Sequence, residues 1–143
     1  MRIGEANALT WEKVDFEKMQ INITCSITTK MHDSDGNYLI STPKTKAGIR
    51  QLPMCKKVAE ALKMAHNYYS SMECFDDKWF CFGGLTAIPE TTIQKANLKY
   101  TKKADIKKIR IHDFRHSCAS LLINNGANIT LVSKYLGHSD IEM

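Results

Sequence analysis

The 143-residue sequence has no apolar run as long as the roughly 18 residues that a membrane-spanning helix requires. The opening stretch, Met1–Glu5, shows no charged leader followed by an apolar segment, which argues against secretion. The five cysteines are odd in number and include no Cys-x-x-Cys pair, so neither a zinc ribbon nor a disulfide framework is indicated. These absences predict a cytoplasmic protein without a membrane partner.

The sequence also contains no low-complexity segment or internal repeat. Apolar residues make up 43% and charged residues 24% of the chain, which are ordinary values for a globular domain and exclude disorder. A chain of 143 residues is long enough for one domain around a single core. The net charge of +5 admits a polyanionic partner without requiring one.

Hydrophobic periodicity predicts a small sheet near the beginning of the chain. Strict alternation from Gln20 to Ile27 is typical of a half-buried strand. The Asp35-Gly36 pair is a hairpin signal, with a return strand over Tyr38–Thr42 and a third strand over Ile49–Leu52. We therefore predict one sheet of three antiparallel strands.

Helical periodicity follows Pro53 and predicts a mostly helical α+β fold. Gly126 is expected just beyond the end of the third helix and Gly137 at the end of the fourth, with Thr130 as the cap of the fourth. The inward stripes of the four helices are Val58, Leu62, Ala65 and Tyr69; Ile93, Ala96 and Tyr100 within Glu90–Lys103; Phe114, Cys118, Leu121 and Leu122; and Leu131, Val132, Tyr135 and Leu136.

Positive charge is concentrated in two segments. Thr42–Lys63 carries a net charge of +5, and Lys95–Arg115 carries +6, so the rest of the chain is acidic. Solvated basic helices are common, and this pattern alone is weak support for nucleic-acid binding. That the two segments share one face is a hypothesis.

His112 and Arg115 form the strongest chemical motif. At positions i and i+3 in the first turn of a helix they share a face, where exposed N–H groups and the positive dipole end favour an anion. An imidazole can transfer a proton there while the guanidinium grips a phosphate. The alternative, favoured for the motif alone, is a helix-capping histidine and an arginine paired with Asp113. His116 follows His112 at i+4, but the pair lacks the glutamate base of a metalloprotease helix, and His116 is expected to pack behind these groups.

Three further motifs are weak individually. Arg2 followed by Glu5 is usually a surface ion pair, and Lys44 alone is a solvated hairpin lysine. His138 follows Leu136-Gly137, where the glycine allows a sharp turn that would present the histidine on a loop.

Together these motifs resemble the catalytic domain of the tyrosine recombinases, the phage-type integrases. Arg2, Lys44, His112-x-x-Arg115 and Leu-Gly-His138 occur in the order and rough spacing of that family. The resemblance covers RIGEANALTWEKVDFEKMQI, TPKTKAGIRQLPM and IRIHDFRHSCASLLINNGANITLVSKYLGHSDIEM, and is greatest to integrases of conjugative transposons and prophages. It implies site-specific DNA recombination or integration through a 3′-phosphotyrosyl intermediate, with double-stranded DNA and other recombinase protomers as partners and a bacterial, nucleoid-associated location.

The resemblance also implies roles for individual residues. Arg2 and Arg115 would clamp the scissile phosphate, and His112 would handle the proton of the attacking tyrosine. The remaining roles are protonation of the departing 5′-oxygen by Lys44, with Lys46 as the alternative, a hydrogen bond from His138 to the phosphate, and support of the arginine and histidine network by Glu5 and His116. No metal or other cofactor is implied, because these cations supply the positive charge.

The sequence departs from the family pattern at both ends. The nucleophilic tyrosine of the family follows the last histidine on a further helix, whereas this sequence ends five residues after His138. The first eight residues read as the end of a helix that starts earlier. Residues 1–143 are therefore expected to be a single truncated catalytic domain without the N-terminal DNA-binding domain, the first catalytic helix and the nucleophile segment, and to be inactive alone.

Alternatives remain for the function and for the one nearby tyrosine. Ala119–His138 superficially resembles a helix-turn-helix, so a non-catalytic DNA-binding module is the second hypothesis. A relative of the type IB topoisomerases is the third. Tyr135 lies on the apolar stripe of its helix and is expected to be a core residue.

Overall fold

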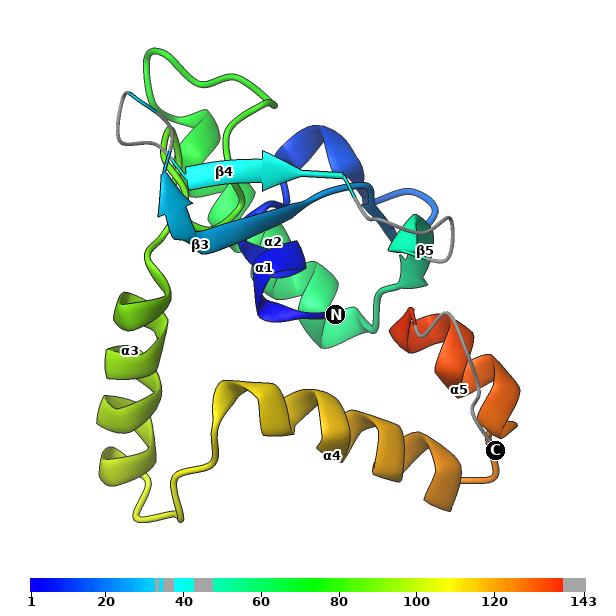
Figure 1. Ribbon diagram of the computed structural model, residues 1–143. Coiled ribbons are helices and arrows are strands. Elements are labelled where there is room, and N and C mark those ends of the chain that lie inside the picture. Colours follow the sequence, from blue (N-terminus) through cyan, green and yellow to red (C-terminus); the bar gives the residue numbers. More distant parts are fainter. Residues whose placement is uncertain (33, 35–37, 43–47, 138–143) are drawn as a thin grey trace.

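The computed structural model describes residues 1–32, 34, 38–42 and 48–137 (Figure 1). The predicted Asp35-Gly36 turn, both hairpin lysines and His138 lie outside the described residues. In chain order the elements are α1 (Ile3–Asn7), a 3₁₀ turn (Trp11–Lys13), β1 (Val14–Asp15), β2 (Gln20–Ile23), β3 (Ser26–His32), β4 (Tyr38–Ser41), β5 (Arg50–Pro53), α2 (Lys56–Ser70), α3 (Glu90–Lys103), α4 (Ile111–Asn124) and α5 (Ile129–Leu136).

The strands form two antiparallel sheets. β2 lies between β1 and β5 in a three-stranded sheet, whereas β3 pairs with β4 in a separate hairpin. The predicted α+β class with a small three-stranded sheet is confirmed, but the prediction that all three expected strands share one sheet is wrong. The alternation does hold, since Ile21, Ile23 and Ile27 are buried. The alternation of apolar and polar residues continues through the break between β2 and β3, so the sequence pattern could not reveal that the chain changes sheets there.

The main core lies between the three-stranded sheet and α2. Trp11, Ile23, Leu52 and Leu62 are among its buried residues. The predicted inward position Val58 is wrong, because this residue is 42% exposed and the neighbouring Ala59 is buried instead. One residue is a rotation of about 100° on a helix, so a small error in the phase of the stripe moves a side chain to the surface.

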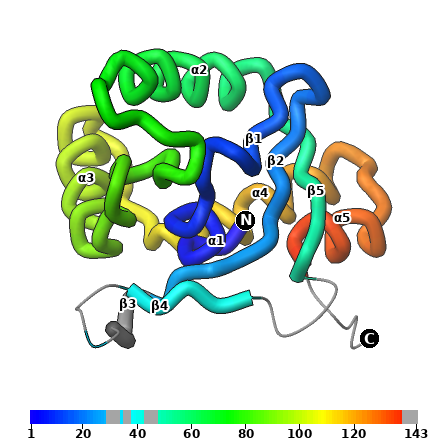
Figure 2. Tube along the Cα trace, turned by 90° about the horizontal axis from the view of Figure 1, so that it is seen from above, coloured from blue at the N-terminus to red at the C-terminus, as the bar shows by residue number. Residues whose placement is uncertain are grey.

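The last three helices follow one another around α1, which is central in both views (Figures 1 and 2). The predicted bounds of α3 are confirmed. Tyr100, Leu121 and Leu131 are each 64% exposed, and Phe114 is also exposed, so their predicted inward positions are wrong. Helices arranged around a short central helix bury only a narrow strip of each surface, less than the stripe that a bundle would cover.

The helix ends are set by specific caps. Asn128, and not the predicted Thr130, caps α5, because its Oδ1 accepts the Thr130 amide at 2.8 Å. Gly126 and Gly137 both have positive φ, as expected for glycines that end helices. α1 begins at Ile3 rather than before residue 1, since the Glu5 carboxylate accepts the Arg2 amide at 2.6 Å.

None of the helices within the described residues has both the length and the apolar composition needed to cross a membrane.

Candidate anion-binding site

The beginnings of α1 and α4 meet around one cavity. Arg2 precedes α1, and His112 and Arg115 lie in the first two turns of α4. All three line a cavity of about 170 Å³. The fold therefore brings together three of the residues singled out in the sequence, although more than 100 positions separate Arg2 from the other two.

Neither His112 nor Arg115 takes part in the cap at the start of α4. Arg110 occupies the N-cap, and its guanidinium bonds the Asp113 carboxylate at 3.0 Å through both Nε and Nη2. The alternative arrangement, a capping histidine with an Arg115–Asp113 pair, is therefore not observed, because Arg110 takes both places. His112 and His116 are both exposed, with their rings edge to face and their centroids 4.8 Å apart.

Arg115 is the buried cation of the cavity, with only 7% of its surface exposed. Burial first, and then the positive charge of Arg2, lower the pKa of the Arg115 guanidinium, while the nearby Glu5 carboxylate opposes this shift. A guanidinium remains charged in proteins, so Arg115 keeps a buried positive charge near that of Arg2. An anion between Arg2 and Arg115 would be attracted by both charges.

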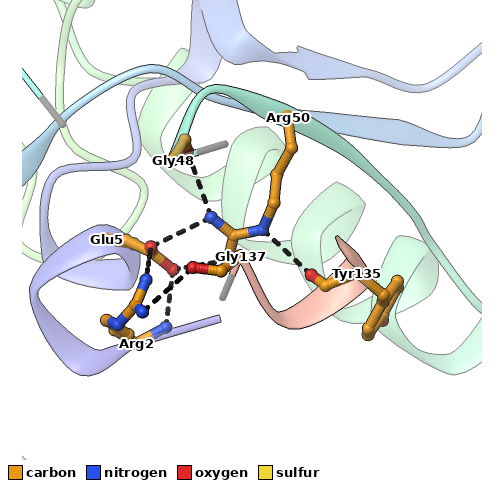
Figure 3. Close-up of polar contacts among 6 residues, drawn as sticks. All are labelled: Arg2, Glu5, Gly48, Arg50, Tyr135 and Gly137. Atoms are coloured by element: carbon orange, nitrogen blue, oxygen red, sulfur yellow. Dashed lines mark hydrogen bonds and ion pairs between the residues drawn. The ribbon is translucent and has the colours of Figure 1, made fainter. Parts of the chain in front are cut away.

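Glu5 does not line the cavity and is a saturated hydrogen-bond acceptor (Figure 3). Its carboxylate accepts the Arg2 amide at 2.6 Å, Arg2 Nη1 at 3.1 Å, and Arg50 Nη1 and Nη2 at 3.0 and 2.8 Å. Burial alone would raise the pKa of Glu5, but the bonds from Arg50 and Arg2 outweigh it and lower the pKa. A carboxylate has about four acceptor sites, so Glu5 has little capacity left to act as a base.

Arg50 is the residue of this network that the sequence analysis missed, because it was counted only as one of the cations of a basic segment. A signal was present. Arg50 is two residues before Leu52 in β5, so both lie on the same face of the strand, and Leu52 is buried in the core. An arginine on a core-facing position needs a buried acid, and Glu5 is that acid.

Arg50 also reaches the end of α5. Its Nε donates to the Tyr135 carbonyl at 2.9 Å, and Arg2 Nη2 donates to the Gly137 carbonyl at 3.1 Å (Figure 3). A Cβ atom on Gly137 would lie 2.7 Å from Arg50 Nη1, and the residue has a φ of +75°. Glycine is required here both for the backbone conformation and for the close approach of the guanidinium.

The remaining predicted residues lie elsewhere or outside the described residues. Tyr135 packs partly buried against the main core, as expected, and lines a different cavity with Leu52 and Met54. Burial raises the pKa of Tyr135, the opposite of what an activated nucleophile needs. Lys44, Lys46 and His138 belong to the undescribed segments.

The lysines of α3 and of the following loop are exposed, which agrees with a solvated basic surface. They are Lys95, Lys99, Lys102, Lys103, Lys107 and Lys108. The Thr42–Lys63 segment is less uniform, because Arg50 is neutralised by Glu5. Over the described part of the chain, no group of three or more His, Cys, Asp or Glu side chains is placed to hold a metal ion.

Comparison with known proteins places these observations in a family context. The model of the phage integrase family matches residues 1–143. The ICEBs1 integrase of Bacillus subtilis is 31% identical over 150 residues, covering 99% of this chain and 39% of that protein. The transposase of transposon Tn916 from Enterococcus faecalis is 28% identical, covering 100% of this chain and 37% of that protein. The chain thus spans about two fifths of the length of these relatives.

Solved structures give the same result for the fold. A Tn1549 transposon integrase variant in complex with transposon right end DNA matches with a TM-score of 0.74 and 26% identity, over 98% of this chain and 47% of that one. The XerA recombinase matches with a TM-score of 0.72 and 25% identity, over 97% and 44% of the two chains.

Proposed function

The chain belongs to the phage integrase family, as its motifs predicted, and from this premise we propose that it is part of a tyrosine recombinase that breaks and rejoins double-stranded DNA during site-specific recombination or integration. The observation that carries the proposal is the single cavity lined by Arg2, His112 and Arg115. Residues 1–143 would form the truncated catalytic domain, acting with other protomers.

The chemistry follows from the charges around the cavity. A phosphodiester between Arg2 and Arg115 relieves the repulsion of two guanidiniums, and it does so most when a further negative charge develops in the transition state. His112, exposed at the cavity, handles the proton of the attacking tyrosine. Lys44, or else Lys46, protonates the departing 5′-oxygen, and His138 donates a hydrogen bond to the phosphate.

The support for catalysis over simple DNA binding lies in the burial of the cations. A helix-turn-helix module reads DNA with exposed side chains of its second helix and would not need a buried Arg115 beside Arg2 and Glu5. The matches to integrases also favour a recombinase over a topoisomerase relative.

The rejoining half of the reaction tests this proposal without a nucleophilic tyrosine. The substrate is a nicked duplex with randomised flanking sequence and a 3′-p-nitrophenyl phosphodiester. The 5′-hydroxyl attacks phosphorus, the bond to the aryl oxygen breaks, p-nitrophenolate leaves, and the hydroxyl proton passes to the lysine or to water. We expect the chain to ligate a subset of the duplexes, which sequencing identifies. No ligation above the protein-free control in any sequence context would contradict the proposal.

DNA binding by the chain is expected to depend strongly on salt. If about five phosphates are neutralised by the exposed lysines, the slope of log affinity against log salt is about −4 to −5. Fluorescence anisotropy between about 50 and 200 mM salt measures it. Replacing Lys95 and Lys99 with glutamine should make the slope less steep by about 2, and a flat salt dependence of the parent chain would refute the basic surface.

The chain should bind DNA without becoming covalently attached to it. An attacking hydroxyl must lie about 3–3.5 Å from phosphorus, and Tyr135 instead packs against the core with a raised pKa. Tyr38 lies in β4, Tyr68 and Tyr69 in α2, and Tyr100 in α3. Incubation with a nicked suicide substrate should therefore give no shifted band on a denaturing gel. A band that disappears in Tyr135→Phe would identify Tyr135 as the nucleophile and contradict its assignment to the core.

A further inference from the structure

Arg50 links three segments of the candidate site without lining its cavity. It lies in β5, bonds Glu5 of α1 and bonds the Tyr135 carbonyl near the end of α5. We propose that Arg50 is a positioning residue of the phosphate clamp, which keeps Arg2 available to the phosphate and fixes the end of α5 beside it. This proposal rests on the proposed function.

The first step of the argument concerns competition for Glu5. The Arg50 guanidinium takes one site on each oxygen of this carboxylate, at 3.0 and 2.8 Å, and its side chain is only 7% exposed. Arg2 is left with one side-chain bond to Glu5 at 3.1 Å, although its own side chain is 44% exposed and has room to move. Without Arg50, Arg2 could form the bidentate pair with Glu5 itself and turn away from the cavity.

The second step concerns the hydrogen bonds of Arg2. A guanidinium has five N–H donors, of which Arg2 uses one on Glu5 and one on the Gly137 carbonyl. Counting acceptors among the described residues alone, three donors therefore remain for a ligand in the cavity. A bidentate pair with Glu5 would use one more and would rotate the planar group as a whole.

The third step concerns the end of α5. The last carbonyls of a helix have no partner within the helix, and the negative dipole end attracts cations. Arg50 binds the Tyr135 carbonyl, and Arg2 binds the Gly137 carbonyl. The two arginines thus hold the same helix end, so a shift of Arg50 would move the acceptor that orients Arg2.

Arginine side-chain NMR can test this role one residue at a time. The sequence has only four arginines, so the Nε–Hε signals of Arg2, Arg50, Arg110 and Arg115 can be assigned individually. In a titration of the parent chain with inorganic phosphate, the Arg2 and Arg115 signals should shift together and fit one dissociation constant. The Arg50 signal should shift little, because its Nε is already bonded to the Tyr135 carbonyl.

The decisive variant is Arg50→Lys, which keeps the charge but cannot hold both Glu5 oxygens and the Tyr135 carbonyl. We expect it to fold, to bind phosphate about tenfold more weakly, and to lose the common response, so that Arg115 still shifts while Arg2 does not. Lys18→Met removes an exposed cation paired with Asp15 and should leave the phosphate affinity unchanged. Arg50→Met should weaken binding at least as much as Arg50→Lys.

The outcomes separate this proposal from the one on which it rests. If neither Arg2 nor Arg115 responds to phosphate in the parent chain, the clamp itself is wrong. If both respond there and respond identically in Arg50→Lys, the clamp stands and Arg50 has only a structural role. An Arg50→Lys chain that is unfolded would also overturn the proposal, because Arg50 would then act on the fold and not on the orientation of Arg2.

Discussion

Replacement of Arg115 by lysine is expected to slow rejoining of the 3′-p-nitrophenyl duplex by about two to three powers of ten, nearly as much as replacement by alanine. The loss corresponds to about 3–4 kcal/mol, the scale of one transition-state donor. The reason is geometric, since the planar fork of arginine can bond two phosphate oxygens at once and an ammonium cannot. Ligation rates on a single selected sequence, from the randomised set, provide the measurement.

His112→Ala is the matched control for this result. p-Nitrophenolate leaves without a proton, so a group that protonates the departing tyrosine is dispensable with this substrate. We expect the alanine variant to retain rejoining within a few-fold, although His112 lines the same cavity as Arg115. Near-normal rejoining by Arg115→Lys would mean that Arg115 serves only to pack α4.

Glu5→Ala is expected to lower the free energy of unfolding by about 3–5 kcal/mol. Removing one partner of a buried ion pair leaves the other charge uncompensated, here the guanidinium of Arg50, which bonds Glu5 at 2.8 Å. Denaturation in urea, followed by circular dichroism, measures the change. Glu12→Ala removes a partly exposed acid that pairs with Lys13 and should cost less than about 1 kcal/mol.

The effect of Glu5 should also depend on pH. Its pKa is lowered in the folded chain, so its contribution is complete above the unfolded pKa of about 4.3 and is lost as the pH falls through the folded value. The difference in stability between the parent chain and Glu5→Gln should therefore shrink in acid. A difference that is constant from neutral pH to about pH 3 would show that Glu5 is not held as a carboxylate by Arg50 and Arg2.

The sequence was most informative where chemistry and local pattern coincide. The first turns of α4 could be predicted from the His-x-x-Arg motif, and the ends of α4 and α5 from the glycines that follow them with positive φ. Both signals depend on only a few neighbouring residues. The exposure of Tyr100, Leu121 and Leu131 could not be predicted, because helical periodicity shows which residues share a face but not whether another part of the chain packs against that face. The change of sheet between β2 and β3 was hidden for a similar reason, because the inward alternation runs through it.

Arg50 shows that the net charge of a segment does not predict which of its cations are buried. Six cations in one stretch look like a solvated surface, yet one of them pairs with a carboxylate 45 residues away. Partners at that distance are set by the fold. A strand arginine that shares its face with a buried leucine is a pattern for which other sequences can be searched.

The bond from Arg2 to the Gly137 carbonyl spans 135 positions of the chain. During synthesis Arg2 emerges 135 positions before Gly137, so a nascent chain carries the donor of this bond long before its acceptor. Contacts of such separation form late in folding, because a long loop must close first. In a growing chain, Arg2 is therefore not held by this bond until Gly137 has been synthesised.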